Sequence, residues 1–233
     1  MTGKLTYEQK TGLYDFLAGF ITDNRKQRFD EIAAFRTRHL TVVLEDIYQS
    51  HNASAVLRSC DCFGIQDVHI IENANTYNVN PDVALGSSKW LSLFKYNQKE
   101  NNTTDCISYL KKKGYTVLAA LPHNNDSLID NVDISKKTAI MFGTEKNGLT
   151  EEAINSADGF VKIPMYGFTE SFNISVSVAI ALYSLSQRLR NSNIHWQLDK
   201  NEIIDMKIEW VKNTIQDAIS LEKKYVEKII NSK

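Results

Sequence analysis

Polar side chains interrupt an otherwise apolar stretch at residues 161–190, and their types could do chemistry. Residues 161–163 predict a short strand, and residues 174–189 predict a helix that is apolar or small almost throughout and therefore buried on all sides. Ser171 and Asn173 lie in the loop between them. Burying such polar groups carries a desolvation penalty. The loop therefore predicts either a functional site or a helix N-terminus that one of these two side chains caps.

A second pair of candidates, Asn52 and Arg58, follows the compact apolar run at residues 41–44. The run predicts a strand, and the residues after it predict a helix that ends at Gly64 in a left-handed cap. Alone, Asn52 would be an N-cap and Arg58 a surface charge. Six residues turn a helix by ~600°, so Arg58 does not lie beneath Asn52. We expect the two side chains to reach a substrate from different levels of one helix.

Glu145 is the third candidate, because it lies between Gly143 and Gly148 directly after a predicted buried strand at residues 138–142. The glycines permit tight backbone turns. Thr150 begins the next helix as a cap. Glu145 is either a structural carboxylate that accepts N–H bonds from its own loop or a residue of the site.

These three stretches resemble the signature blocks of the SpoU (TrmH) family of RNA ribose 2′-O-methyltransferases. The matching segments are LEDIYQSHNASAVLRSCDCFG, GTEKNGLTEE and IPMYGFTESFNISVSVAIALY, in the family's order. Phe172 stands where the family usually has Leu, and Ser184 replaces an acidic residue. Three blocks over ~200 residues are a specific signal, where one alone would be weak.

The alternation of strands and helices between residues 41 and 190 itself predicts an α/β fold with a mostly parallel sheet and helices on both faces. No G-x-G-x-x-G follows the first strand, which disfavours a dinucleotide-binding or Rossmann-type methyltransferase. The resemblance implies the α/β-knot (SPOUT) fold with a C-terminal trefoil knot, which the general preference for unknotted connections would not suggest. We expect a helical extension at residues 1–39, the knotted domain at 40–190, and a connector with a C-terminal helix at 191–233.

The resemblance also implies the cofactor, the partners and the site. S-adenosylmethionine would bind a pocket built largely from backbone, and the chain would form a homodimer with each site near the subunit interface. The expected cofactor-binding residues are Ala120, Leu121, Gly143, Ile163, Met165 and Phe172. The expected catalytic residues are Arg58, Asn52, Glu145, Ser171 and Asn173. A guanidinium with a pKa above ~12 is a poor base, so Arg58 is expected to position phosphate and stabilise the developing oxyanion, with a role as base left open.

Resemblance along the full chain favours the branch that methylates guanosine 18 in the D-loop of tRNA. A ribose methylase of ribosomal RNA or of another tRNA position is the first alternative. A catalytically silent RNA-binding relative is the second, and the intact set of catalytic residues argues against it.

Basic residues gather near the start of the chain, although the net charge is −1 and the pI about 6.5. RNA would therefore have to bind local patches. The basic cluster at residues 25–38 is equally well interpreted as a solvated helix face or as a phosphate-binding surface. The expected RNA-binding residues are Arg25, Arg28, Arg36, Lys89, Arg188 and Arg190.

Composition bounds the remaining expectations. The N-terminus has no apolar core of a signal peptide, and no apolar run approaches the ~18 residues of a membrane span. Cys60, Cys62 and Cys106 and five scattered histidines form neither a disulfide framework nor a metal set. We therefore expect a cytoplasmic, metal-free protein.

The C-terminal region carries an apolar seam on a predicted helix that runs from Glu202 and is interrupted at Glu222. We expect the seam to pack against the protein's own body or a second subunit. Its residues are Ile204, Ile208, Val211, Ile215 and Ala218, resumed by Tyr225 and Ile229.

Overall fold

The computed structural model describes residues 5–78, 80–84, 86–122 and 127–231. Two compact units make up the chain: an α/β unit, Thr37–Trp196, and a helical unit that combines Met1–Arg36 with Gln197–Lys233. Residues from both predicted extensions thus enter one helical unit. Within the described residues, no helix is long and apolar enough to cross a membrane.

A six-stranded sheet forms the centre of the α/β unit, in the order β3-β2-β1-β5-β4-β6. All five neighbouring pairs are parallel, which confirms the predicted sheet type. The strands are β1 (Leu40–Glu45), β2 (Asp67–Ile71), β3 (Ser92–Tyr96), β4 (Thr116–Ala120), β5 (Thr138–Phe142) and β6 (Gly159–Val161).

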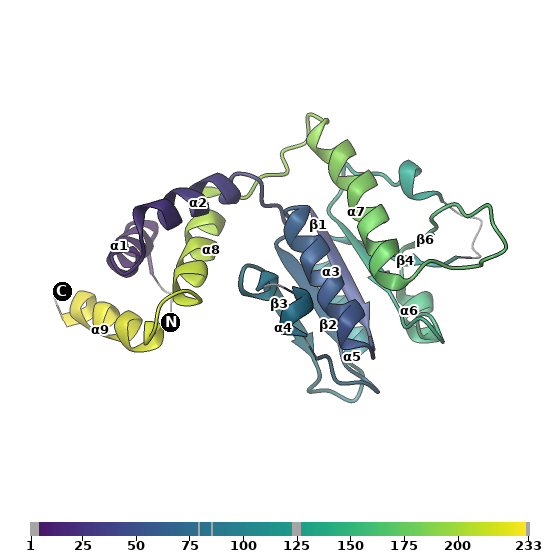
Figure 1. The fold of residues 1–233 in the computed structure, drawn as a ribbon, viewed down its shortest axis with the longest axis horizontal. Coiled ribbons are helices and arrows are strands. Elements are labelled where there is room, and N and C mark those ends of the chain that lie inside the picture. Colours follow the sequence, from purple (N-terminus) through teal and green to yellow (C-terminus); the bar gives the residue numbers. More distant parts are fainter. Residues whose placement is uncertain (1–4, 79, 85, 123–126, 232–233) are drawn as a thin grey trace. The chain divides into compact units, whose positions relative to one another are not determined.

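Helices cover both faces of this sheet (Figure 1). Val42 and Leu44 of β1 belong to the core beneath α3 (Ser50–Cys62) and α7 (Ile174–Arg190). Val43 faces the other core, beneath α5 (Asn102–Lys112) and α6 (Glu151–Ser156). A strand buried on both faces needs a continuous apolar run, and this explains the sequence of β1. Short α4 (Pro81–Ala84) and the 3₁₀ turns η2 (Ser87–Lys89) and η3 (Ile129–Asn131) complete the unit.

Two predictions about the stretch at residues 161–190 are wrong. The expected strand at 161–163 lies at Gly159–Val161, because pairing with β4 joins Leu118 to Gly159 and Ala120 to Val161. Helix α7 is also not buried on all sides. One face packs against α3 and the sheet core, whereas Val176 and Tyr183 on the other face are exposed.

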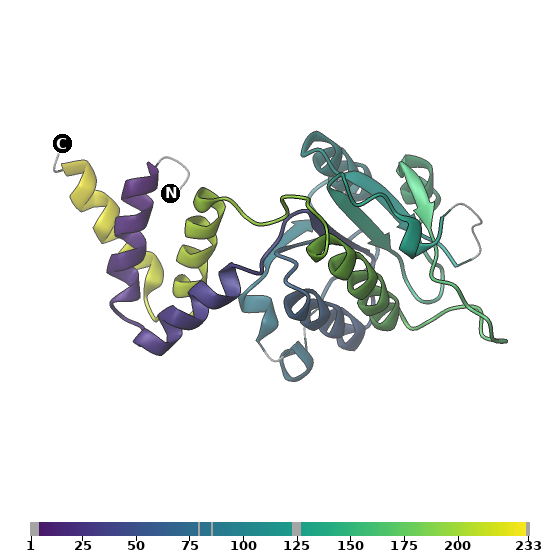
Figure 2. The same ribbon diagram turned by 90° about the horizontal axis from the view of Figure 1, so that it is seen from above.

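The helical unit contains α1 (Tyr7–Ala18), α2 (Asp23–Ala33), α8 (Lys200–Lys212) and α9 (Ala218–Asn231), shown from above in Figure 2. The capping box of Thr6 and Gln9 that starts α1 is present. Helix α1 packs against α8, and the Phe16 ring stacks on Tyr225 with 5.2 Å between centroids. The apolar seam is therefore covered in part by the chain itself.

The predicted continuous helix after Glu202 is broken. Helix α8 ends at Lys212, and Asp217 adopts a left-handed conformation (φ 52°) before α9 begins. Glu222 does not interrupt the seam but is buried, 3.0 Å from the Lys212 ammonium. The side chain of Ile229 lies outside the described residues.

Candidate active site

Three predicted catalytic side chains meet in one hydrogen-bonded cluster. The Glu145 Oε1 atom accepts from Asn52 Nδ2 at 2.8 Å and from Asn173 Nδ2 at 2.7 Å. Asn173 Nδ2 also lies 3.1 Å from Asn52 Oδ1. The carboxylate is therefore oriented by two amides, each from a different helix.

The fold brings these residues together at the carboxyl ends of β1 and β5, which are parallel neighbours. Asn52 lies in the first turn of α3, after β1, and Glu145 lies in the loop after β5. Asn173 is the N-cap of α7. The carboxyl ends of parallel strands are where ligands bind in α/β sheets.

Asn173 caps a helix, as the sequence predicted, and its side chain also joins the polar cluster. Its Oδ1 accepts the Ser175 N–H at 2.8 Å, which caps α7, while its Nδ2 donates to Glu145. Gln49, which sequence reasoning did not single out, is a further neighbour, since its Oε1 accepts from Asn52 Nδ2 at 2.9 Å. The three-residue spacing of Gln49 and Asn52 at a helix start was the available signal.

A cavity of about 550 Å³ opens beside the cluster. Glu145, Ser171 and Asn173 contribute to its wall. Its wall also includes every residue predicted to bind the cofactor: Ala120, Leu121, Gly143, Ile163, Met165 and Phe172.

The loop that presents Glu145 is a tight hairpin. Thr144 and Gly148 exchange two main-chain hydrogen bonds of 2.9 Å. A Cβ atom on Gly143 would lie 2.1 Å from the Gly148 carbonyl carbon, and Gly148 has φ 68°. Both glycines are therefore required by the backbone, one for a close approach and one for its left-handed conformation.

Comparison with known proteins shows the family of the chain. A profile described as the SpoU rRNA Methylase family matches residues 39–183. The chain belongs to this family. A tRNA (guanosine(18)-2′-O)-methyltransferase of Borreliella burgdorferi is 44% identical over 216 residues, 93% of this chain and 95% of the relative. The enzyme of the same name from Thermus thermophilus is 36% identical over 170 residues, 72% of this chain and 86% of the relative.

A solved structure shares the fold of this SpoU-family chain. The A. aeolicus TrmH/SpoU tRNA modifying enzyme superposes with a TM-score of 0.74 at 26% identity, covering 83% of this chain and 98% of that one. The fold of the chain is therefore that of a known SpoU architecture.

Arg58 and Ser171, the other two predicted catalytic residues, lie outside the cluster. Arg58 is exposed on α3 and makes no hydrogen bond or ion pair with the described part of the chain. This placement agrees with the ~600° of helix rotation between Asn52 and Arg58, which was expected to point the two side chains in different directions. Ser171 is exposed at the cavity wall.

Three of the predicted RNA contacts, Arg36, Arg188 and Arg190, have side chains that contact other parts of the chain. Arg36 is 2% exposed, with its guanidinium 5.4 Å from the Trp210 ring. Arg188 donates to the Ile129 and Val132 carbonyls. Arg190 donates to the Phe63 carbonyl at 3.0 Å and stacks on Trp196, and burial lowers the pKa of its guanidinium.

The remaining basic candidates lie at the surface. Arg25, Arg28 and Lys89 are exposed, and Arg28 pairs with Glu31 at 3.3 Å. Among the described residues, no group of three or more His, Cys, Asp or Glu side chains could hold a metal ion.

Proposed function

We propose that this chain transfers the methyl group of S-adenosylmethionine to the ribose 2′-hydroxyl of guanosine 18 in tRNA. The observation that carries the proposal is the cluster of Asn52, Glu145 and Asn173 at the edge of the cavity. The printed names of the Borreliella burgdorferi and Thermus thermophilus relatives give the substrate and the position.

S-adenosylmethionine is the cofactor of this family, and the cavity fits it. The volume of about 550 Å³ falls within the ~300–1,000 Å³ of small-molecule sites, and the apolar residues of its wall suit an adenine ring. Ala120, Leu121, Ile163, Met165 and Phe172 would hold the cofactor against the loop of Gly143. When bound, it supplies an activated methyl group on a sulfonium.

The residues of the chain then have to hold the 2′-hydroxyl in line with the methyl group, let its proton leave as the O–C bond forms and the S–C bond breaks, and neutralise phosphate. Glu145, fixed by its two amide donors, orients the polar groups around the acceptor ribose. Ser171 contributes a hydroxyl at the cavity wall. Arg58 can turn its planar guanidinium toward a substrate phosphate. A guanidinium binds a phosphate through two parallel N–H···O hydrogen bonds.

We infer that the functional form is a knotted homodimer in the cytoplasm, where tRNA is modified. The exposed apolar side chains of Val176 and Tyr183 on α7 support a second copy as the cover of that face. Arg25, Arg28 and Lys89 are the proposed phosphate contacts.

Methyl transfer to purified tRNA, with the modified nucleotide mapped, tests the proposal. Ribose methylation at guanosine 18 is expected. Methylation at another position or in ribosomal RNA would replace the substrate assignment. Cofactor binding without any transfer would indicate the silent relative.

A further inference from the structure

A buried carboxylate, Glu45, lies at the carboxyl end of β1, at the same edge of the sheet as the site. Its side chain is 1% exposed. Its Oε1 accepts from the hydroxyls of Thr103 at 2.6 Å and Thr150 at 2.8 Å, and its Oε2 accepts the Thr150 N–H at 2.9 Å. A buried carboxylate persists when such donors satisfy it, and here both oxygens are used.

Thr150 ends the loop that presents Glu145. The other end of the loop continues from β5 through Gly143, which packs against Gly148. Glu145 therefore lies between two anchors: the close packing of the glycines and the bond network of Glu45. Two of the three bonds to Glu45 reach Thr150, so this carboxylate holds the carboxyl end of the loop.

We propose that Glu45 is a positioning residue that fixes the loop of residues 143–150 so that Glu145 meets Asn52 and Asn173. The activity readout of this inference rests on the proposed methyl transfer, whereas the loop's rigidity can be measured independently. Glu45→Gln is the informative change. An amide nitrogen in place of Oε2 would face the Thr150 N–H, and one in place of Oε1 would take away the acceptor to which both threonine hydroxyls donate.

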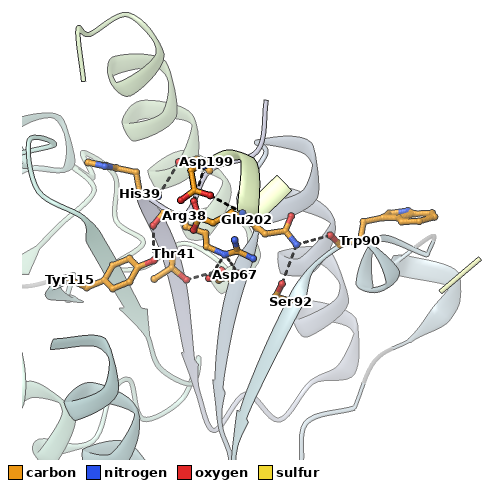
Figure 3. Close-up of polar contacts among 11 residues, drawn as sticks. Arg38, His39, Thr41, Asp67, Trp90, Ser92, Tyr115, Asp199 and Glu202 are labelled. Carbon is orange, nitrogen blue, oxygen red and sulfur yellow. Dashed lines mark hydrogen bonds and ion pairs between the residues drawn. The ribbon is translucent and has the colours of Figure 1, made fainter. Parts of the chain in front are cut away.

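Asp67 provides a matched control at the opposite end of the strands, because it begins β2. It is 7% exposed, and both its oxygens lie 3.0 Å from Arg38 Nε (Figure 3). Its main-chain carbonyl accepts from Thr41, and the Arg38 carbonyl accepts from Tyr115. Asp67→Asn makes the same carboxylate-to-amide change in a buried network that does not reach the loop.

The test compares the full-length variants in two assays. With tRNA and S-adenosylmethionine, Glu45→Gln should lower kcat by about tenfold or more, since small displacements of catalytic groups are costly, and change KM for tRNA little. Amide hydrogen exchange across residues 143–150 should become about tenfold faster in Glu45→Gln. Asp67→Asn should lower the melting temperature while leaving kcat and this exchange rate at the parental values.

Substitutions of Thr150 test the same contact with Glu45 from the donor side. Thr150→Val removes the hydroxyl that donates to Glu45 and that also caps α6 by accepting the Ala153 N–H, so it should lower kcat, whereas Thr150→Ser keeps both contacts and should retain more activity. Combining Thr150→Val with Glu45→Gln should lower kcat by less than the product of the two single effects, because each single variant already disturbs the Thr150–Glu45 hydroxyl contact.

Parental kcat and parental loop exchange in Glu45→Gln would overturn the inference. An equal loss of kcat in Asp67→Asn would also overturn it, since a general loss of stability would then explain both. If the parent chain methylates no tRNA, the proposed function fails, and the exchange comparison still decides the role of Glu45.

Discussion

Asn173 uses the two ends of its side-chain amide for two different purposes, capping α7 and donating to Glu145. Asn173→Asp separates them. The aspartate still caps the helix, but it replaces the donor with an oxygen facing the Glu145 carboxylate. We expect kcat to fall by more than about tenfold with little change in the melting temperature. Asn173→Asp with parental turnover in a methyl-transfer assay would reduce Asn173 to a cap.

Arg58 is the residue on which the proposed binding of a substrate phosphate depends most. Arg58→Ala should abolish methyl transfer while leaving the affinity for S-adenosylmethionine within a few-fold, because other residues line the cavity. Arg58→Lys should rescue little, since a point charge does not replace a planar fork. Calorimetric titration of the cofactor and single-turnover transfer measure the two effects separately. Near-normal turnover in either variant would exclude the assignment.

At the scale of elements, β2 contains a buried histidine that links stability to pH. His69 stacks on Phe94 with 4.8 Å between centroids and lies 2.9 Å from the Tyr96 hydroxyl. Burial lowers the pKa of His69 to about 4, below its ordinary value of 6.5. As the pH falls from 6.5 toward 4, the unfolded chain binds a proton that the folded chain does not bind. The free energy of unfolding should therefore fall by up to about 3 kcal/mol over this window.

Denaturant unfolding at pH 7 and pH 4.5 measures this effect. His69→Phe should remove that part of the pH dependence, because phenylalanine cannot be protonated. His195→Phe, at an exposed position, should keep it. An unchanged pH dependence in His69→Phe would contradict the linkage.

The elements also show how far the sequence could be interpreted. The run at residues 138–142 gave β5 correctly, because a strand buried on both faces is apolar throughout. The same reasoning was wrong for α7, since apolar composition does not say which of its faces the chain's own core covers. The break between α8 and α9, which contains Asp217, was missed because the apolar repeat continues across it.

The residues of the candidate site could be predicted where they belong to sequence motifs. They could not be predicted where contacts between distant segments bring them together. Asn52, Glu145 and Asn173 stand in signature blocks, so their meeting could be expected from the resemblance. Glu45 gave no signal, because its donors Thr103 and Thr150 come from distant parts of the chain. For the same reason, the packing of Arg36 on Trp210 was not visible in a local cluster of charges.

At the scale of the whole molecule, a net charge of −1 requires that tRNA bind through local contacts. We expect the affinity for tRNA to fall as the salt concentration rises. The slope of log affinity against log salt should correspond to about four or more phosphate contacts, at ~0.7–0.9 per contact. Arg25→Ala with Arg28→Ala should flatten that slope and raise KM for tRNA without changing cofactor binding. The control is Lys223→Ala with Lys224→Ala, since these two lysines are exposed in the same unit. This variant should leave the slope unchanged. A parental slope in the arginine variant would exclude the N-terminal cluster from the RNA site.

The most direct test of the account uses one tRNA in two forms, unmodified and with 2′-deoxyguanosine at position 18. The protein is incubated with each and with S-adenosylmethionine labelled in the methyl group. We predict about one methyl group per unmodified tRNA, mapped to the ribose of guanosine 18, and none on the deoxy form. Equal incorporation into both tRNAs, or none into the unmodified one, would contradict the account.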